Sequence, residues 1–193
     1  MFTFLIPLYY ITSKLAEEKE SKSREGMKMM GLKDSTYFLS WMTTYTVIIF
    51  GMCLLITFMV SFNTFRQSNK FLIFIMNFIY GISLFGFAVV VVAVLPTQRS
   101  SSLAVSLLHV VTFFVVFAIQ SPDIGASVKI ALSIFPNVGM ALSIFDLFHF
   151  EVQSSGLSMS SANIWYANYT YTAGLLMLSF NVVFYLIIGL YLD

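Results

Sequence analysis

The stretch "AEEKESKSREGMKMMGLKDS", residues 16–35, lies between two strongly apolar segments and carries most of the charge in the first half of the chain. The rest of the sequence is very different. Of 193 residues, 59% are hydrophobic and only 10% are charged, whereas soluble domains carry about 25% charged residues. The composition therefore predicts a membrane protein in which this stretch is the main segment exposed to water.

The charged stretch has the composition of a helix. Lys, Glu, Met and Arg are strong helix formers, and Glu18–Lys22 is an i,i+4 pair in the favourable order. Met27 lies toward an apolar edge, and Gly31 is placed to end the helix. We predict an amphipathic cytosolic helix over residues 16–36.

Four segments are long and apolar enough to cross a bilayer, which takes about 20 residues. None of them contains Asp, Glu, Lys or Arg, and they cover residues 37–60, 71–95, 103–120 and 171–192. The N-terminal apolar run, residues 2–15, is too short to cross. No basic residue precedes it, as one would in a signal peptide. We expect it to be the end of a span whose beginning is missing, and the chain to be a fragment.

The basic residues orient the four spans. With residues 16–36 in the cytosol, seven basic residues lie inside and three lie outside; the inside set is Lys14, Lys19, Lys22, Arg24, Lys28, Lys33 and Arg99, and the outside set is Arg66, Lys70 and Lys129. This asymmetry agrees with the positive-inside rule. Near the cytosolic end of the first span, Tyr37 and Trp41 fit an interfacial aromatic belt.

Residues 127–150 are apolar but do not read as a crossing helix. Pro136-Asn137 interrupts the middle, and Lys129 and Asp146 lie near the ends. Proline removes a helical hydrogen bond, and Pro-Asn is typical of turns. We predict a re-entrant pair of short helices that enters from the outer face and turns at Pro136 and Asn137. Such a turn requires cover from protein or water.

No catalytic or cofactor site is predicted in the chain. Gly26-x-x-x-x-Gly31 lacks the Lys-Ser/Thr that follows in a phosphate-binding loop. Asp146, His149 and Glu151 are three potential metal ligands, whereas a closed site normally has four. The net charge of +1 gives no indication of a nucleic-acid partner.

Polar residues inside the spans are predicted to make interhelical hydrogen bonds. His109 and Thr112 share one helix face, and Asn77 and Asn181 are in other spans. Asn168-Tyr169-Thr170 is a possible glycosylation sequon on the outer side, close to the last span.

The motif Glu18-Lys19-Glu20-x-Lys22-x-x-Glu25-x-Met27-x-x-Met30-Gly31-Leu32 resembles the cytosolic helix of the membrane domains of A-subfamily ABC transporters, the lipid exporters. Downstream, Phe135-Pro136-Asn137-Val138, then Glu151 and Gly156-Leu157, resemble the outer-face segment of that family. Asn181 stands where the resemblance leads us to expect an acid.

The resemblance implies an all-α membrane domain: the tail of one span, four complete spans, a cytosolic coupling helix and a re-entrant outer-face hairpin. It implies ATP and Mg²⁺ on a nucleotide-binding domain in cis or in trans, a second half-transporter and a lipid substrate. The residues that would couple to the nucleotide-binding domain are Glu18, Lys19, Glu20, Lys22, Arg24, Glu25, Met27, Met30 and Gly31.

Other readings stay open. The charged helix could be a solvated, orienting segment, as charge runs commonly are. The chain could also be a truncated, non-transporting remnant or a membrane interaction protein of the same fold. An ion-coupled transporter is disfavoured because such proteins usually place charged residues within their spans. An intramembrane enzyme is disfavoured because no catalytic constellation lies in a span.

Overall fold

The computed structural model describes residues 1–31 and 33–192, apart from the side chains of Arg24, Asp34 and Ser35, and this part of the chain is almost entirely helical. A short 3-10 turn, η1 (Phe2–Phe4), leads into the first helix. The helices are α1 (Leu5–Glu20), α2 (Ser23–Met29), α3 (Asp34–Asn63), α4 (Lys70–Val94), α5 (Gln98–Ile119), α6 (Ala126–Leu132), α7 (Pro136–Val152) and α8 (Tyr171–Leu192).

Four of these helices, α3, α4, α5 and α8, are long and apolar enough to span a membrane, which confirms the predicted class of fold. Helix α5 begins earlier than the apolar run because Thr97 caps it: its hydroxyl oxygen accepts a hydrogen bond from the backbone N–H of Ser100. The serines that follow donate their hydroxyls to backbone carbonyls one turn back. Polar residues thus extend this helix beyond its hydrocarbon segment.

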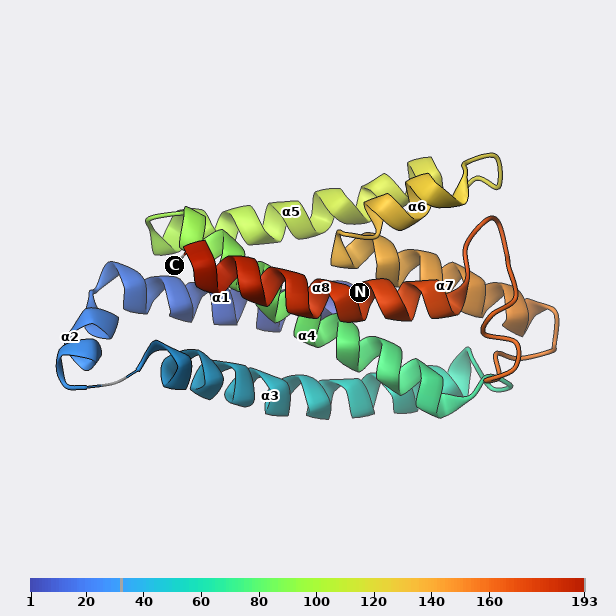
Figure 1. The fold of residues 1–193 in the computed structure, drawn as a ribbon. Coiled ribbons are helices and arrows are strands. Elements are labelled where there is room, and N and C mark those ends of the chain that lie inside the picture. Colours follow the sequence, from blue (N-terminus) through green and yellow to red (C-terminus); the bar gives the residue numbers. More distant parts are fainter. Residues whose placement is uncertain (32, 193) are drawn as a thin grey trace.

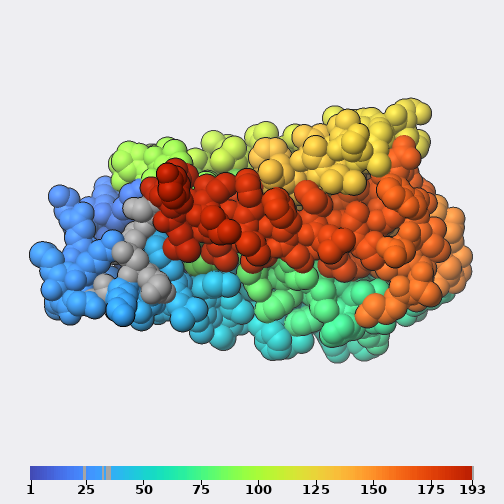
Figure 2. Space-filling model, viewed as in Figure 1, coloured from blue at the N-terminus to red at the C-terminus, as the bar shows by residue number. Residues whose placement is uncertain are grey.

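The long helices run side by side in one elongated bundle (Figure 1). Helix α2 lies at one end, together with the start of α3 and the end of α8. The α3–α4, α5–α6 and α7–α8 connections lie at the other end, and the N-terminus lies about halfway along. The surface view shows the same order, with the blue α1–α2 segment at one end and the yellow and orange segments at the other (Figure 2). This arrangement matches the predicted separation of cytosolic and outer loops.

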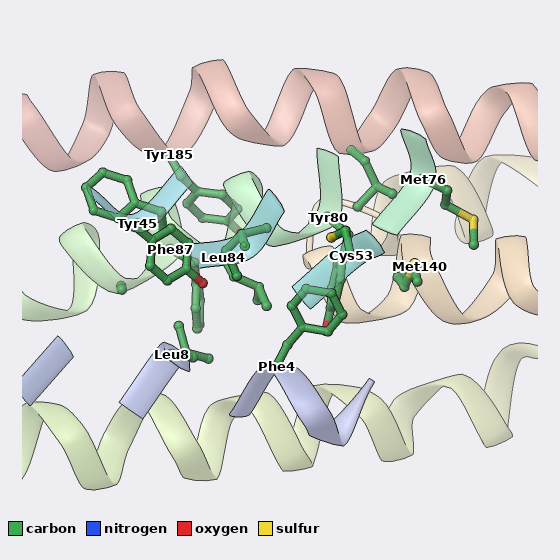
Figure 3. Packing of buried hydrophobic residues seen from close by; sticks show 14 of the residues in the cluster. Phe4, Leu8, Tyr45, Cys53, Met76, Tyr80, Leu84, Phe87, Met140 and Tyr185 are labelled. Carbon is green, nitrogen blue, oxygen red and sulfur yellow. The ribbon is translucent and has the colours of Figure 1, made fainter. Parts of the chain in front are cut away.

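Helix α4 is the centre of the bundle. Its most apolar window is 72% buried, compared with 22–33% for the other three spans. Side chains from η1, α1, α3, α7 and α8 pack against it (Figure 3). Two glycines of α4 allow this close packing: a Cβ on Gly81 would lie 2.4 Å from Ile49, and one on Gly86 would lie 2.9 Å from Tyr185. The core of the domain therefore forms around α4, and each of the other three spans leaves one face exposed, where lipid can contact it.

Helices α6 and α7 form the interrupted segment that the sequence indicated. The chain reverses over residues 133–135, and Pro136 is the first residue of α7. Proline suits this position because it has no N–H to satisfy and its φ angle is already helical. The pair occupies only the half of the bundle's length that holds the α3–α4 and α5–α6 connections (Figure 1).

The predicted cytosolic helix over residues 16–36 is divided in the structure. Helix α1 continues through the first part of it, to Glu20. Lys22 then adopts a left-handed φ of 55°, which ends the helix before α2 begins. Glu18 and Lys22 therefore do not form the i,i+4 helical pair that the spacing favoured. Gly31, with a φ of 97°, follows the end of α2.

Candidate functional site

Three successive residues at the end of α1, Glu18, Lys19 and Glu20, each contact a different membrane span. We call them the α1 triad. Glu18 contacts α3: its Oε2 accepts hydrogen bonds from the Tyr37 hydroxyl at 2.6 Å and from Trp41 Nε1 at 3.1 Å. Tyr37 and Trp41 are one helical turn apart on the same face of α3, so a single carboxylate reaches both.

The other two members of the triad contact helix ends. Lys19 Nζ donates to the carbonyl oxygens of Val92 at 2.6 Å and Ala93 at 2.8 Å, at the C-terminus of α4. Glu20 Oε2 accepts from the backbone N–H of Gln98 at 2.8 Å, at the N-terminus of α5. A helix C-terminus carries partial negative charge and an N-terminus partial positive charge. The cation and the anion therefore each meet the complementary end of a helix.

Helix α2 projects beyond this junction. Met27 is half-buried and packs against the hydrophobic core. Met29 and Met30 are 86% and 82% exposed, and Lys22 and Glu25 are also exposed.

The proposed coupling residues thus lie in two groups. The α1 triad and Met27 face the spans, while Lys22, Glu25 and Met30 face outward, as does Gly31. The Arg24 side chain lies outside the described part of the structure, as does Leu32. Sequence reasoning missed Met29 and Gln98, and it placed Tyr37 and Trp41 in an aromatic belt rather than on Glu18.

The turn between α6 and α7 is held by polar side chains from the spans. The Asn137 amide nitrogen donates to the His109 carbonyl at 2.8 Å and to Thr112 Oγ1 at 2.7 Å, and Asn137 Oδ1 accepts from the Tyr80 hydroxyl at 2.5 Å. This confirms the prediction of a hydrogen bond across the bundle for the Thr112 side chain. His109 contributes only its backbone carbonyl to this turn, and its ring Nδ1 is buried without a hydrogen-bond partner.

Helix α8 covers the same turn. Asn181 Nδ2 donates to the Ser133 carbonyl at 2.9 Å, and the Tyr185 hydroxyl donates to the Ile134 carbonyl at 2.8 Å. The first contact explains why an amide stands where an acid was expected, because a carboxylate cannot donate to a carbonyl. Asn77 differs from the prediction: it donates to Ile73 in its own helix.

The comparison with known proteins bears on the whole of this arrangement. A sequence model of the protein family described as "ABC-2 family transporter protein" matches residues 1–191 of this chain. The chain belongs to the ABC-2 transporter family. It is a multi-pass membrane domain homologous to membrane domains of the A subfamily.

The curated relatives are much longer proteins. The human protein named cholesterol transporter ABCA5 is 29% identical over 187 residues, which cover 96% of this chain and 11% of the relative. Human ATP-binding cassette sub-family A member 6 is 27% identical over 188 residues, covering 97% and 12%. The mouse ABC-type organic anion transporter ABCA8A is 29% identical over 188 residues, covering 96% and 11%. This chain therefore spans about a tenth of the length of these relatives.

At the opposite end of this ABC-2 domain from α2, a second cluster of contacts joins the α3–α4 connection to the end of α7. Glu151 accepts from Gln67 N at 2.9 Å and from Ser68 Oγ at 2.6 Å. Ser68 Oγ in turn accepts from Leu157 N at 2.9 Å. Burial acts to raise the pKa of Glu151, but hydrogen bonds from Ser68 and from the backbone lower it overall. Gly156, at a φ of 62°, could not carry a Cβ because it would lie 2.4 Å from the Gln67 carbonyl oxygen.

The other candidate residues near the end of α7 have different surroundings. His149 stacks on Tyr166 with 3.6 Å between ring centroids, and Asp146 is buried. Together with Glu151 they form no metal-binding group, and none is found elsewhere among the described residues. Asn168 Nδ2, the atom that a glycan would modify, donates to the carbonyls of Pro122 at 2.7 Å and Ile124 at 3.2 Å.

Proposed function

We propose that this chain is the membrane domain of an ATP-driven lipid transporter. ATP and Mg²⁺ would bind to a nucleotide-binding domain supplied in cis or in trans, and a second half-transporter would complete the pathway. Three observations support this function: the family, a relative named as a cholesterol transporter, and the absence of charged residues from the four predicted spans. The observation that carries the mechanism is the α1 triad, which ties one cytosolic helix end to α3, α4 and α5.

The geometry supports two separate roles in coupling, one for α2 and one for the α1 triad. The exposed methionines of α2 suit contact with the nucleotide-binding domain, because methionine side chains are flexible and polarisable and adapt to a partner surface. Movement of α2 would then pass into α1, and the α1 triad would carry it to the three spans. Coupling of this kind needs a contiguous, physically connected element. In this proposal the triad acts inside the membrane domain, and the nucleotide-binding domain touches Met29, Met30 and the outward charges.

The test is a pair of substitutions in the full-length protein that carries this domain. Met29→Ser together with Met30→Ser should lower lipid-stimulated ATP hydrolysis and leave membrane insertion unchanged. Met159→Ser is the control, because Met159 is also an exposed methionine, at 63%, but lies on the outer loop. Unchanged stimulated hydrolysis in the double variant would refute the contact. If no ATPase domain or partner accompanies the native protein, the non-transporting alternative replaces the proposal.

A further inference from the structure

Two charged side chains are buried where α6 and α7 meet the α7–α8 connection. Lys129 of α6 is 1% exposed and Asp146 of α7 is 3% exposed. Each side chain lies within range of the other's charge, so the two attract each other. Both are among the residues that the structure describes, and it shows no ion pair between them. A buried charge is costly unless it is paired and hydrogen-bonded, so this arrangement requires an explanation.

The two side chains differ in their hydrogen bonds. Lys129 Nζ donates to the carbonyl oxygen of Ala167, in the α7–α8 connection. Asp146 Oδ2 is buried and has no hydrogen-bond partner among the described residues. A lysine ammonium has three N–H donors, and an ionised carboxylate only accepts. Lys129 therefore has a second acceptor nearby, of opposite charge, that it does not use in this arrangement.

The acceptor that Lys129 does use belongs to a tight turn. Ala167 and Asn168 both have positive φ angles, 44° and 60°. The flanking residues Tyr166 and Tyr169 exchange two backbone hydrogen bonds, at 2.9 and 2.8 Å. This is the pattern of a two-residue hairpin turn, in which Gly and Asn are usual and Ala is unfavourable because of its Cβ. The turn therefore depends on contacts from other elements, and Lys129 supplies one of them.

We propose that Lys129 is a latch with two positions. In the first position, which the structure shows, it holds the turn at Ala167 against α6. In the second position it donates to Asp146 instead, and the turn is released from α6. A hydrogen bond between two charged groups is stronger than one to a neutral carbonyl. The carboxylate therefore compensates Lys129 for the contact that it loses.

Other contacts of the α7–α8 connection stabilise the first position. Asn168 donates to two carbonyls of the α5–α6 connection, His149 stacks on Tyr166, and the Tyr169 hydroxyl is hydrogen-bonded to Ser133. The contacts of the turn thus compete with the ion pair of the second position. This competition gives the connection two discrete arrangements, as a conformational switch requires. Because the turn immediately precedes α8, its release would free the start of that span.

The latch goes beyond the proposed function, because its two positions require neither ATP nor a nucleotide-binding domain. The test is hydrogen–deuterium exchange of the full-length protein in membranes without nucleotide, measured on a peptide that covers residues 163–170. Lys129→Met removes the latch and should speed exchange of this peptide about tenfold, as expected for loss of a hydrogen bond from a charged donor. Asp146→Asn keeps the shape but removes the charge that favours the second position, and it should slow exchange about fivefold.

Two controls distinguish a latch from the simple burial of a charge. Asp123→Asn makes the same chemical change on the α5–α6 connection, where Asp123 is exposed, and should leave exchange of the peptide unchanged. In a Lys129→Met background, Asp146→Asn should no longer slow exchange, because the lysine that would move is absent. If Asp146 acted only through its unpaired charge, its removal would slow exchange in both backgrounds.

Three results would overturn the latch. The first is unchanged or faster exchange of the peptide in Asp146→Asn, which can be measured even where Lys129→Met does not fold. The second is equal slowing by Asp146→Asn with and without Lys129. The third is slowing that extends equally to peptides from α4, because it would report the stability of the whole domain instead of the turn. All three would leave the ATP-driven transport proposal standing, since they are measured without nucleotide.

Discussion

Replacing Asn137 or Asn181 by Ala should lower the stability of the protein to different degrees, although each substitution removes one buried side-chain amide. Asn137 makes three interhelical hydrogen bonds, which join α7 to α4 and α5. Asn181 makes one, to the turn before α7, and its Oδ1 is buried without a hydrogen-bond partner. The structure therefore predicts that Asn137 is the more important of the two.

The expected magnitudes follow from interhelical hydrogen bonds in membranes, which average about 0.6 kcal/mol each. Asn137→Ala should lower the free energy of unfolding by about 2 kcal/mol, and Asn181→Ala by about 0.6 kcal/mol. The difference of about 1.4 kcal/mol corresponds to about tenfold in the unfolding equilibrium constant.

The assay is reversible denaturation of the full-length protein in mixed micelles, followed by a reporter near α7. Equal destabilisation by the two variants would refute the reasoning, as would a larger effect of Asn181→Ala. Either result would mean that packing, rather than the hydrogen bonds to the turn, dominates at this depth. A Tyr80→Phe variant, which removes only the hydroxyl that donates to Asn137, should lower the free energy of unfolding by about 0.6 kcal/mol, the same as Asn181→Ala.

Further predictions concern the two ends of the bundle. Lys19→Met should lower stability by about 1–2 kcal/mol, because it removes two charge-assisted hydrogen bonds at a helix C-terminus; Lys14→Met, at an exposed ion pair, should not change the thermal midpoint. Gly156→Ala should lower the free energy of unfolding by more than the roughly 1 kcal/mol expected for Gly31→Ala, because both glycines have positive φ but only Gly156 faces a backbone oxygen. Thermal unfolding of the two variants measures both effects. The lowered pKa of Glu151 stabilises the folded state above pH 4.5, its ordinary value, and this contribution is lost as the pH falls through the lowered pKa. Glu151→Gln should therefore be less stable than the unsubstituted protein at neutral pH, and the gap should close in acid; a gap that does not depend on pH would contradict this.

Much of the membrane architecture could be predicted from the sequence because lipid leaves few choices. A span must be helical and apolar over about 20 residues, so the four crossings were visible as uncharged runs. The interruption of residues 127–150 was visible because proline cannot continue a helix through its preceding turn. The bias of Lys and Arg predicts the orientation, since that rule depends on the loops alone.

The partners of individual polar side chains could not be predicted in the same way. Thr112 and Asn77 both lie inside spans, yet the first accepts a bond from another helix and the second bonds its own backbone. Periodicity gives the face on which a residue lies, but not what packs against that face. For the same reason the outward charges of α2 and the inward charges of α1 looked alike in the sequence.

By itself, then, the sequence determined that this protein is a helical membrane domain and where its four spans lie, because hydropathy acts along the chain; which loops face the cytosol stays a prediction from the charge of the loops. Only the tertiary structure decided that Glu18, Lys19 and Glu20 join α1 to three spans, and that Asn181 donates to Ser133. Those assignments depend on which helix ends and carbonyls lie within about 3 Å, the range of a hydrogen bond. That proximity arises when segments far apart in the chain pack together.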